Sequence, residues 1–336
     1  MAAVSIADLI AAWAPRLQRA FMAAIADITD RAQVGVIAAM VERDDVEGAL
    51  HAVGIDPVAF RVLDAATAQA FEAGGNHVVA RMPVLRRPDG QRLSIRFDVR
   101  NPDAENWLRE HSSRKVTEIV EDQRQMIRSA LVAGMAAGRN PRDVALDLVG
   151  RIDPATGKRQ GGTIGLTSNQ EEWVRRYADE LARLDPNALT RQLRDKRFDG
   201  TVRKAIEAGR PLTAEQIAKM VAAYRNRALR HRTETIGRTE AMVSLHQSQE
   251  EATRQAIAAG QINPAMVVEI WRTTLDGRER DTHRQMNGQT VRRGQPFVSP
   301  SGARLRYPGD PRAPASEIIN CRCWREVRVD YLAEIV

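Results

Sequence analysis

The sequence has few aromatic residues and no long apolar run. Phe, Trp and Tyr together make up 4% of its 336 residues, so Ala, Leu, Ile and Val must provide most of the packing, which favours helices. No run of about 18 uncharged apolar residues occurs, which argues against a membrane-spanning helix. The segment from Met1 to Ala14 carries Asp8 and no basic stretch, so it does not resemble a signal peptide.

Cysteine is almost absent as well. The two cysteines, Cys321 and Cys323, are separated by one residue, which is an awkward spacing for an unstrained disulfide. A disulfide framework is therefore excluded, and a reduced, cytoplasmic setting fits better.

Basic residues exceed acidic ones. Fifty Lys and Arg against 43 Asp and Glu give a net charge of +7, and arginine far outnumbers lysine. Such a surface would attract nucleic acid or acidic protein partners. The alternative explanation is a high-GC genome that favours arginine codons.

The length allows two or three domains, and the patterns predict a mainly α fold. We expect a multi-helix body with an inserted β-hairpin and a small C-terminal α+β domain. The predicted segments are N-terminal helices over 1–76, a β-hairpin arm over 77–100, a helical body over 101–260 and the α+β domain over 261–336.

The N-terminal segment has apolar residues at helical spacing. Between Ser5 and Arg43 they predict one long helix or a broken pair. A second helix is predicted from Pro57, where Asp56 can cap, to Glu72, and Gly74-Gly75 is expected to end it.

Between His77 and Arg100 the pattern changes to period two. Alternating residues on both sides of Pro88-Asp89-Gly90 predict a hairpin with one apolar face. It has little core of its own, so we expect it to cover the bundle or to project toward another subunit.

The predicted helical body begins with a long helix from about Asp103 to Ala137. A short helix from Asn140-Pro141 to Val149 follows, and then an exposed loop or short hairpin over 150–165. The glycines and basic residues of this loop suggest phosphate binding only weakly, because no strand leads into a GxxxxGK[ST] element.

Capping patterns mark the remaining helices. Thr167 begins a helix that ends near Leu184, and shorter helices are predicted over 186–194 and 201–208. Thr213 with Gln216 forms a capping box that starts a helix of more than forty residues, which Gly260 ends.

The middle of that long helix is unusually polar and contains Gly237. One interpretation is a solvated face with ion pairs; the other uses the glycine, which inside a helix usually signals close approach of another backbone. In the second case Arg232, Arg238 and Glu240 would form a polar seam against the C-terminal domain.

The C-terminal domain is predicted to begin with a strand that includes Trp271. Asn287-Gly288 is a turn signal before a strand at Thr290-Val291, and a final alternating strand runs from Cys321 to Val329. Alternation places Cys321 and Cys323 on the same side.

Two thiols on one side of a strand can ligate zinc. Candidate ligands are His283, Cys321 and Cys323, with Asp276 or Asp281 as a fourth. The spacing of one residue is less common in zinc sites than CxxC, and the interpretation that it favours is two buried thiols packing as small apolar groups. A catalytic Cys–His pair is a further alternative, but nothing in the sequence orients the base.

Several of these residues together resemble the phage Mu F-like head-morphogenesis family of minor head or minor capsid proteins. The resemblance covers roughly 100–329, and Asn320-Cys321-Arg322-Cys323 is its most specific part. The other matching residues are Gly165-Leu166-Thr167 with Gln170, Arg232, Ile236-Gly237-Arg238-Thr239-Glu240, Trp271, Asp276, Asp281-Thr282-His283, Asn287-Gly288 and Tyr307-Pro308-Gly309-Asp310-Pro311.

The resemblance implies a low-copy virion component without catalytic activity. It would assemble with the portal protein at one vertex of the phage head, inside the host cytoplasm, and aid capsid assembly, DNA packaging or delivery. Further implied partners are the major capsid or scaffolding protein, packaged DNA through non-specific electrostatics, and other copies of the chain, with no membrane while the protein is in the head. Many relatives have an additional cysteine pair where this sequence has 276–281, which weakens the zinc interpretation.

Two other classes of function stay open from the residues. One is an enzyme, either a metal-dependent nuclease or hydrolase or an ADP-ribosyltransferase-like protein, built on His283, the acidic pair Asp276 and Asp281, and the segment Arg238-Thr239-Glu240. The other is a basic DNA-binding virion protein. The sequence shows no acid–base pair in a recognisable catalytic spacing, which disfavours the enzyme.

Overall fold

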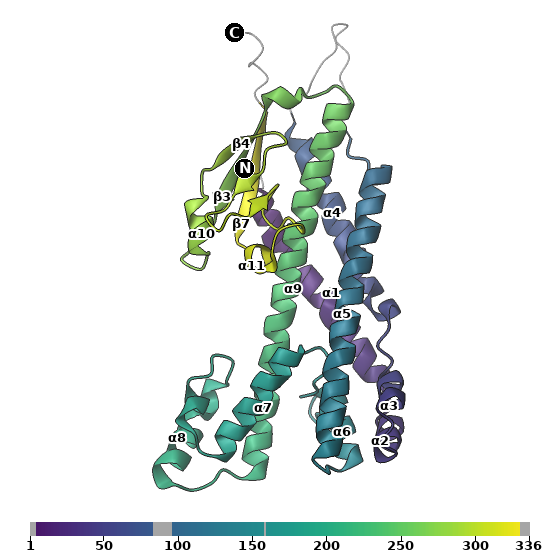
Figure 1. Cartoon of the computed structure of the whole chain (residues 1–336), viewed down its shortest axis with the longest axis vertical. Coiled ribbons are helices and arrows are strands. Elements are labelled where there is room, and N and C mark those ends of the chain that lie inside the picture. The colour runs from purple at the N-terminus through teal and green to yellow at the C-terminus, as the bar shows by residue number, and fades with distance from the viewer. Residues whose placement is uncertain (1–4, 83–95, 158, 330–336) are drawn as a thin grey trace. The chain divides into compact units, whose positions relative to one another are not determined.

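A computed structural model describes residues 5–82, 96–157 and 159–329 (Figure 1). It is 65% helical, with small antiparallel sheets in the C-terminal region, which confirms the mainly α fold with a C-terminal α+β part. Among the described helices, none has the length and apolar character needed to cross a membrane.

The chain forms two compact units, each drawn from separate stretches. Unit 1 contains Met1–Phe21, Leu63–Ser113 and Glu234–Val336, and unit 2 contains Met22–Val62 and Arg114–Thr233. The divisions fall within or at the ends of four long helices, namely α1 (Ile6–Arg31), α4 (Arg61–Arg81), α5 (Pro102–Ala136) and α9 (Ala214–Ala258).

Unit 2 is helical, and its part from Leu166 to Ala228 packs around an apolar core. Leu166, Tyr177, Leu181 and Tyr224 are among the buried residues of this core. Besides its parts of the long helices, the unit contains α2 (Val34–Glu42), α3 (Val46–Val53), η1 (Pro57–Phe60), α6 (Pro141–Val149), β1 (Arg151–Ile152), β2 (Arg159–Gln160), α7 (Ser168–Ala182), η2 (Pro186–Leu189), η3 (Lys196–Phe198) and α8 (Asp199–Ala208).

Unit 1 holds the C-terminal α+β part. Its main sheet has the antiparallel order β4-β3-β7, with Trp271 opposite Arg325 and Thr273 opposite Cys323. The elements after α9 are η4 (Pro264–Met266), β3 (Val267–Thr273), α10 (Asp281–Gln285), β4 (Thr290–Arg292), β5 (Phe297–Val298), β6 (Arg304–Leu305), α11 (Ala315–Ile318) and β7 (Cys323–Val329).

The predicted helix ends are confirmed where capping chemistry defines them. The Asp56 and Asn140 side chains accept backbone hydrogen bonds at the starts of η1 and α6. Thr167 and Thr213 each form a capping box with the glutamine three residues on. Gly260, just after α9, adopts φ of +68°, as a glycine that ends a helix does.

The hairpin predicted over 77–100 is wrong at both of its described ends. His77 to Arg81 lie in α4, which continues through Gly74-Gly75, and 96–98 form no strand. The segment 83–95 lies outside the described residues. The two glycines serve packing instead of ending the helix, because a Cβ on Gly75 would lie 2.1 Å from the Phe97 ring.

A second correction concerns the helix predicted over 186–194. Only the 3₁₀ turn η2 forms there. The backbone carbonyls of Arg191 and Arg194 accept hydrogen bonds from the guanidinium groups of Arg194 and Arg227, at 2.8 and 2.6 Å, in place of the next helical turn. Helix α3, by contrast, was not predicted.

Gly237 lies where α9 meets another backbone, as predicted. A Cβ there would stand 2.5 Å from the Ala14 carbonyl oxygen and 2.8 Å from the Gln18 backbone nitrogen, both on α1. The approaching backbone is therefore that of α1 and not that of the C-terminal domain.

We expect Gly237→Ala to destabilise the protein by about 1–3 kcal/mol, because backbone atoms of α1 cannot yield as a flexible side chain would. This net loss already includes the roughly 1 kcal/mol by which alanine favours a helix over glycine. Gly35→Ala in α2 is the matched control, since no atom lies within 4 Å of its added Cβ, and it should stabilise. Urea unfolding of both variants measures the difference, and equal effects would contradict the close approach.

Candidate functional site

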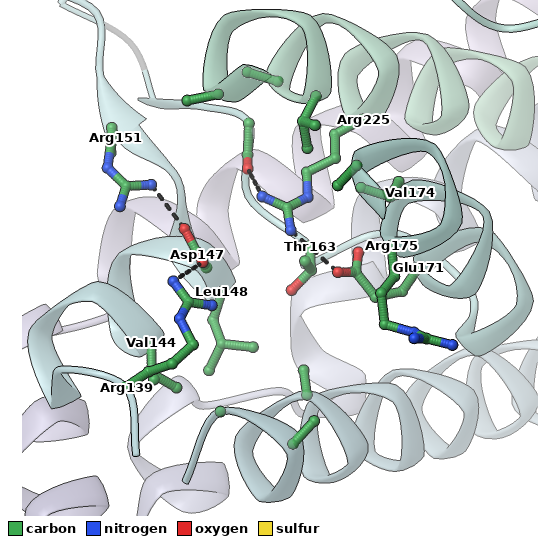
Figure 2. A pocket seen from close by; sticks show the side chains of 18 of the residues that line it. Arg139, Val144, Asp147, Leu148, Arg151, Thr163, Glu171, Val174, Arg175 and Arg225 are labelled. Atoms are coloured by element: carbon green, nitrogen blue, oxygen red, sulfur yellow. Dashed lines mark hydrogen bonds and ion pairs between the residues drawn. The ribbon is translucent and has the colours of Figure 1, made fainter. Parts of the chain in front are cut away.

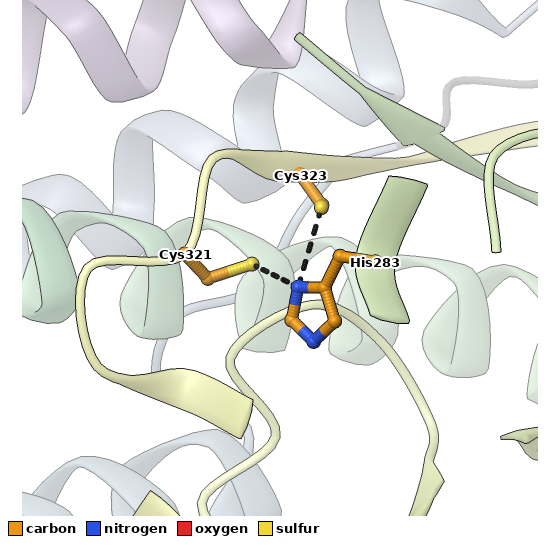
Figure 3. A group of neighbouring side chains, drawn as sticks. All are labelled: His283, Cys321 and Cys323. Atoms are coloured by element: carbon orange, nitrogen blue, oxygen red, sulfur yellow. Dashed lines mark hydrogen bonds between the residues drawn. The ribbon is translucent and has the colours of Figure 1, made fainter. Parts of the chain in front are cut away.

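Two thiols and one imidazole meet in the C-terminal part of unit 1 (Figure 3). The Sγ atoms of Cys321 and Cys323 lie 3.3 and 3.5 Å from Nδ1 of His283. The three ligand atoms all lie within 4.8 Å of one another, and the three residues are buried. The structure thus brings together three residues predicted as ligands, and both thiols are buried, as the apolar-packing interpretation also requires.

Local structure explains how the thiols converge. Asn320, between α11 and β7, has φ of +55°, which reverses the chain just before Cys321. Its backbone N–H donates to Thr239 Oγ1 at 3.3 Å, and its amide donates to Thr235 Oγ1 at 3.1 Å, so α9 holds the turn. Cys323 begins β7, and its pairing with Thr273 of β3 fixes the second thiol.

A carboxylate orients the imidazole. His283 Nε2 lies 2.7 Å from Glu317 Oε2, and Ser301 donates to the other oxygen of Glu317 at 2.7 Å. If Nε2 carries the hydrogen, Nδ1 presents its lone pair to the thiols. Metal-binding histidines are commonly held this way, with the second ring nitrogen on a carboxylate.

The cluster favours a thiolate at one position. The hydrogen bond from Cys321, with those from His283 and Thr273, outweighs burial and lowers the pKa of Cys323 to about 5. The hydrogen bond with Cys323, together with burial, raises the pKa of Cys321 well above its usual value. Burial lowers the pKa of His283, but its interactions with Cys323 and Glu317 prevail and raise it.

The predicted fourth ligand is not part of this group. Asp276 binds Arg322 at 2.5 Å and Arg278 at 3.3 Å, and the side chain of Asp281 is 87% exposed and pairs with Arg284. Among the described residues, only His283 and the two cysteines form a group with ligand spacing. Two sulfurs and one imidazole nitrogen fit zinc, which also binds with three protein ligands and one open position.

The polar segment of α9, residues 230–240, contacts α5 and the residues just before α7. Arg232 donates to the Gly165 carbonyl at 2.9 Å and pairs with Asp122 of α5 at 2.8 Å, while Glu240 pairs with His111 of α5 at 2.7 Å. The prediction that Arg232 and Glu240 form a polar seam against the C-terminal domain is therefore wrong. The C-terminal domain instead meets α9 at Thr235 and Thr239, whose hydroxyl oxygens accept hydrogen bonds from Asn320.

Residues 196–325 match the family model described as Phage Mu protein F like protein. The match confirms the family resemblance seen in the sequence, and it includes the residues from Arg232 to Cys323 that carried it. The part of the predicted resemblance before residue 196, with Gly165-Leu166-Thr167 and Gln170, lies outside the match. No curated protein and no solved structure gives a match. The Phage Mu protein F like family is one of phage head morphogenesis, and its members are generally structural.

Unit 2 contains a large cavity, of about 1090 Å³, that lies mostly outside the matched region (Figure 2). We call it the α5–α9 cavity. Only its α9 wall, between Ala214 and Arg225, belongs to the part that matches the Phage Mu protein F like family. Small residues leave this space open: Ser129, Ala130, Ala133 and Gly134 on α5, and Ala214, Ala218 and Ala222 on α9.

The polar groups of the α5–α9 cavity are partly paired. Arg225 binds Glu171 at 3.1 Å, and Asp147 is held by Arg139 and Arg151 at 2.7 and 2.8 Å. Burial raises the pKa of Glu171 despite Arg225. This cavity was not predicted, although the spacing of small residues on the two helices was a readable signal.

A second cavity of about 340 Å³, which we call the thiol cavity, lies in unit 1. Cys321 and Cys323 line it, together with Arg238 of α9 and residues of the first part of α1. The Asn320-Cys321-Arg322-Cys323 motif and the polar segment of α9 therefore both contribute to the lining of the thiol cavity. Both belong to the part that matches the Phage Mu protein F like family.

Proposed function

We propose that this chain is a phage minor head protein that assembles with the portal protein at one vertex of the head. The observation that carries the proposal is the match of residues 196–325 to the Phage Mu protein F like family. In this proposal the protein is a low-copy structural component of the virion that aids capsid assembly, DNA packaging or DNA delivery. The major capsid or scaffolding protein and further copies of the chain are additional proposed contacts.

The hydrolase or transferase alternative has no specific support from its acidic residues. Asp276 and Asp281, the acidic residues on which it depends, are engaged with arginines. The basic composition is compatible with a place near packaged DNA, where binding would be sequence-tolerant and weakened by salt.

We propose the α5–α9 cavity as the place where a helical segment of the portal docks. Its volume exceeds the roughly 300–1,000 Å³ of small-molecule pockets, and its walls are mainly apolar. Ile152 at its rim is 59% exposed, so it offers apolar surface to a partner. An amphipathic helix laid in such a groove buries an apolar face of matching length.

Co-expression with the portal protein of the same phage tests both proposals. We expect the chain to co-purify with the portal oligomer and to be found at one vertex of isolated heads by electron microscopy. Ala133→Trp, which puts a large side chain at an exposed position of the cavity lining, should abolish co-purification. Ala137→Trp, an exposed position outside the lining, should leave it intact.

The outcomes separate the function from the docking place. If the unmodified chain is absent from both the portal complex and the isolated heads, the proposed function is wrong. If it is present and Ala133→Trp binds as well as Ala137→Trp, the function stands and the cavity is not the docking place.

A further inference from the structure

The thiol cavity has one apolar wall and one cationic end. Residues of α1 and the final strand form the wall, and Arg238 and Arg322 reach the cavity from α9 and from the turn before β7. The residues of the wall are Ala7, Ile10, Ala11, Ala14, Pro15 and Trp324.

The arginines around this cavity outnumber the carboxylates that serve them. Asp276 alone pairs with both Arg322, at 2.5 Å, and Arg278, at 3.3 Å. Nε of Arg322 is buried and has no hydrogen-bond partner among the described residues. A guanidinium nitrogen taken out of water without an acceptor is costly, so the cavity favours an additional acceptor.

Arg238 is the least satisfied of the three. It is partly buried, and within the described part of the chain its guanidinium makes no hydrogen bond or ion pair at contact distance. Burial and the nearby charges of Arg322 and Arg278 lower its pKa, although the charges of Asp276 and Glu234 oppose the shift. An anion between Arg238 and Arg322 would give both guanidinium groups an acceptor and would offset the repulsion between them.

We propose that the thiol cavity binds a carboxylate carried on a short apolar stem, as in a glutamate side chain of a partner protein. The planar forks of two arginines match the two oxygens of a carboxylate, and each charged hydrogen bond is stronger than a neutral one. The methylene groups of the stem would pack on the apolar wall of α1. The volume of about 340 Å³ suits one side chain.

The surroundings favour a carboxylate over a phosphate of DNA. Glu234 also lines the cavity, and Asp276 pairs with Arg322, which lines it too. A strongly charged polyanion would therefore meet two acidic groups. The apolar wall offers nothing to a sugar–phosphate backbone. This binding goes beyond the proposed assembly with the portal.

Butyrate is the probe, because it is a carboxylate on a three-carbon stem. We expect saturation-transfer NMR to show saturable, millimolar binding of butyrate to the full chain, and no comparable binding of butyramide. Arg238→Gln should weaken butyrate binding at least about tenfold. Arg230→Gln, an exposed arginine of the same helix outside the cavity, is the matched control and should bind like the unmodified chain.

A second variant keeps the test valid if Arg238→Gln disturbs folding. Ala11→Leu, at an exposed position of the apolar wall, should reduce butyrate binding without changing any charge. Equal binding of butyrate and butyramide, or equal loss in Arg230→Gln, would overturn the carboxylate site. Tighter binding of inorganic phosphate than of butyrate, abolished by Arg238→Gln, would overturn it in favour of a phosphate ligand.

Discussion

The protein purified from zinc-containing medium will carry about one zinc ion per chain. The expected ligands are Sγ of Cys321, Sγ of Cys323 and Nδ1 of His283, which already lie within 4.8 Å of one another. Glu317 holds the other ring nitrogen, so little ordering is needed before the metal binds. Metal content by mass spectrometry, after dialysis against metal-free buffer, measures the stoichiometry.

Removing the metal should expose the thiols and lower stability. The sequence has two cysteines, so a thiol reagent should react slowly with the loaded protein and modify two groups per chain after chelation. Because zinc ligation contributes directly to folding free energy, we expect chelation to lower the Tm of the protein by several degrees or more.

Single substitutions identify the ligands. Cys321→Ser, Cys323→Ser and His283→Ala should each lose the ion, and Glu317→Gln should weaken affinity by about 10–100-fold as an orienting partner. His51→Ala, an exposed histidine of α3, is the control and should retain the ion. Metal-free protein with unchanged Tm in chelator would show that the thiols and imidazole only pack and hydrogen-bond.

The sequence predicts the starts and ends of helices well where nearby side chains determine them. The start of η1 at Asp56, the box at Thr167 and the end of α9 at Gly260 depend on side chains within a few positions, so they can be read directly. The four consecutive segments predicted as domains stay a prediction, whereas the two compact units each draw on separated stretches, which local patterns do not reveal.

Tertiary contacts explain where the predictions from the sequence failed. Gly74 and Gly75 look like a helix end, yet α4 continues because a side chain from another element occupies the space that each glycine leaves. At the cluster of His283, Cys321 and Cys323, alternation predicted the shared side of the two thiols and composition predicted His283. Glu317, 34 residues from His283 in sequence, could not be assigned, and neither could the arginines that take Asp276 away from the cluster.

Arg325→Ala should be among the most destabilising substitutions in unit 1. Arg325 is fully buried and pairs with Glu250 at 2.7 Å and with Glu269 at 3.2 Å. Removing one partner from a buried charge network costs about 3–5 kcal/mol, because the remaining carboxylates stay out of water. Arg293 also contacts both glutamates, at 2.6 and 2.8 Å, so we expect the lower end of this range.

A matched exposed pair provides the control for this network. Arg328 pairs with Glu326 on the same strand, but its side chain is 61% exposed, so Arg328→Ala should cost no more than about 1 kcal/mol. Urea unfolding at pH 7 compares the two variants. Similar small losses would contradict a stabilising role of the buried network.

The cost of Arg325→Ala should also shrink as the solution is acidified. Burial would raise the pKa of Glu250, but Arg325 and Arg293 prevail and lower it to about 2 from an ordinary value of 4.5. A carboxyl with a depressed pKa contributes stability above pH 4.5 and loses it as the pH falls toward 2. Without Arg325 this contribution is smaller, so the difference in unfolding free energy between the unmodified chain and Arg325→Ala should decrease from pH 7 to pH 3. A difference that stays constant over this range would show that lost packing, and not the charge on Glu250, accounts for the effect.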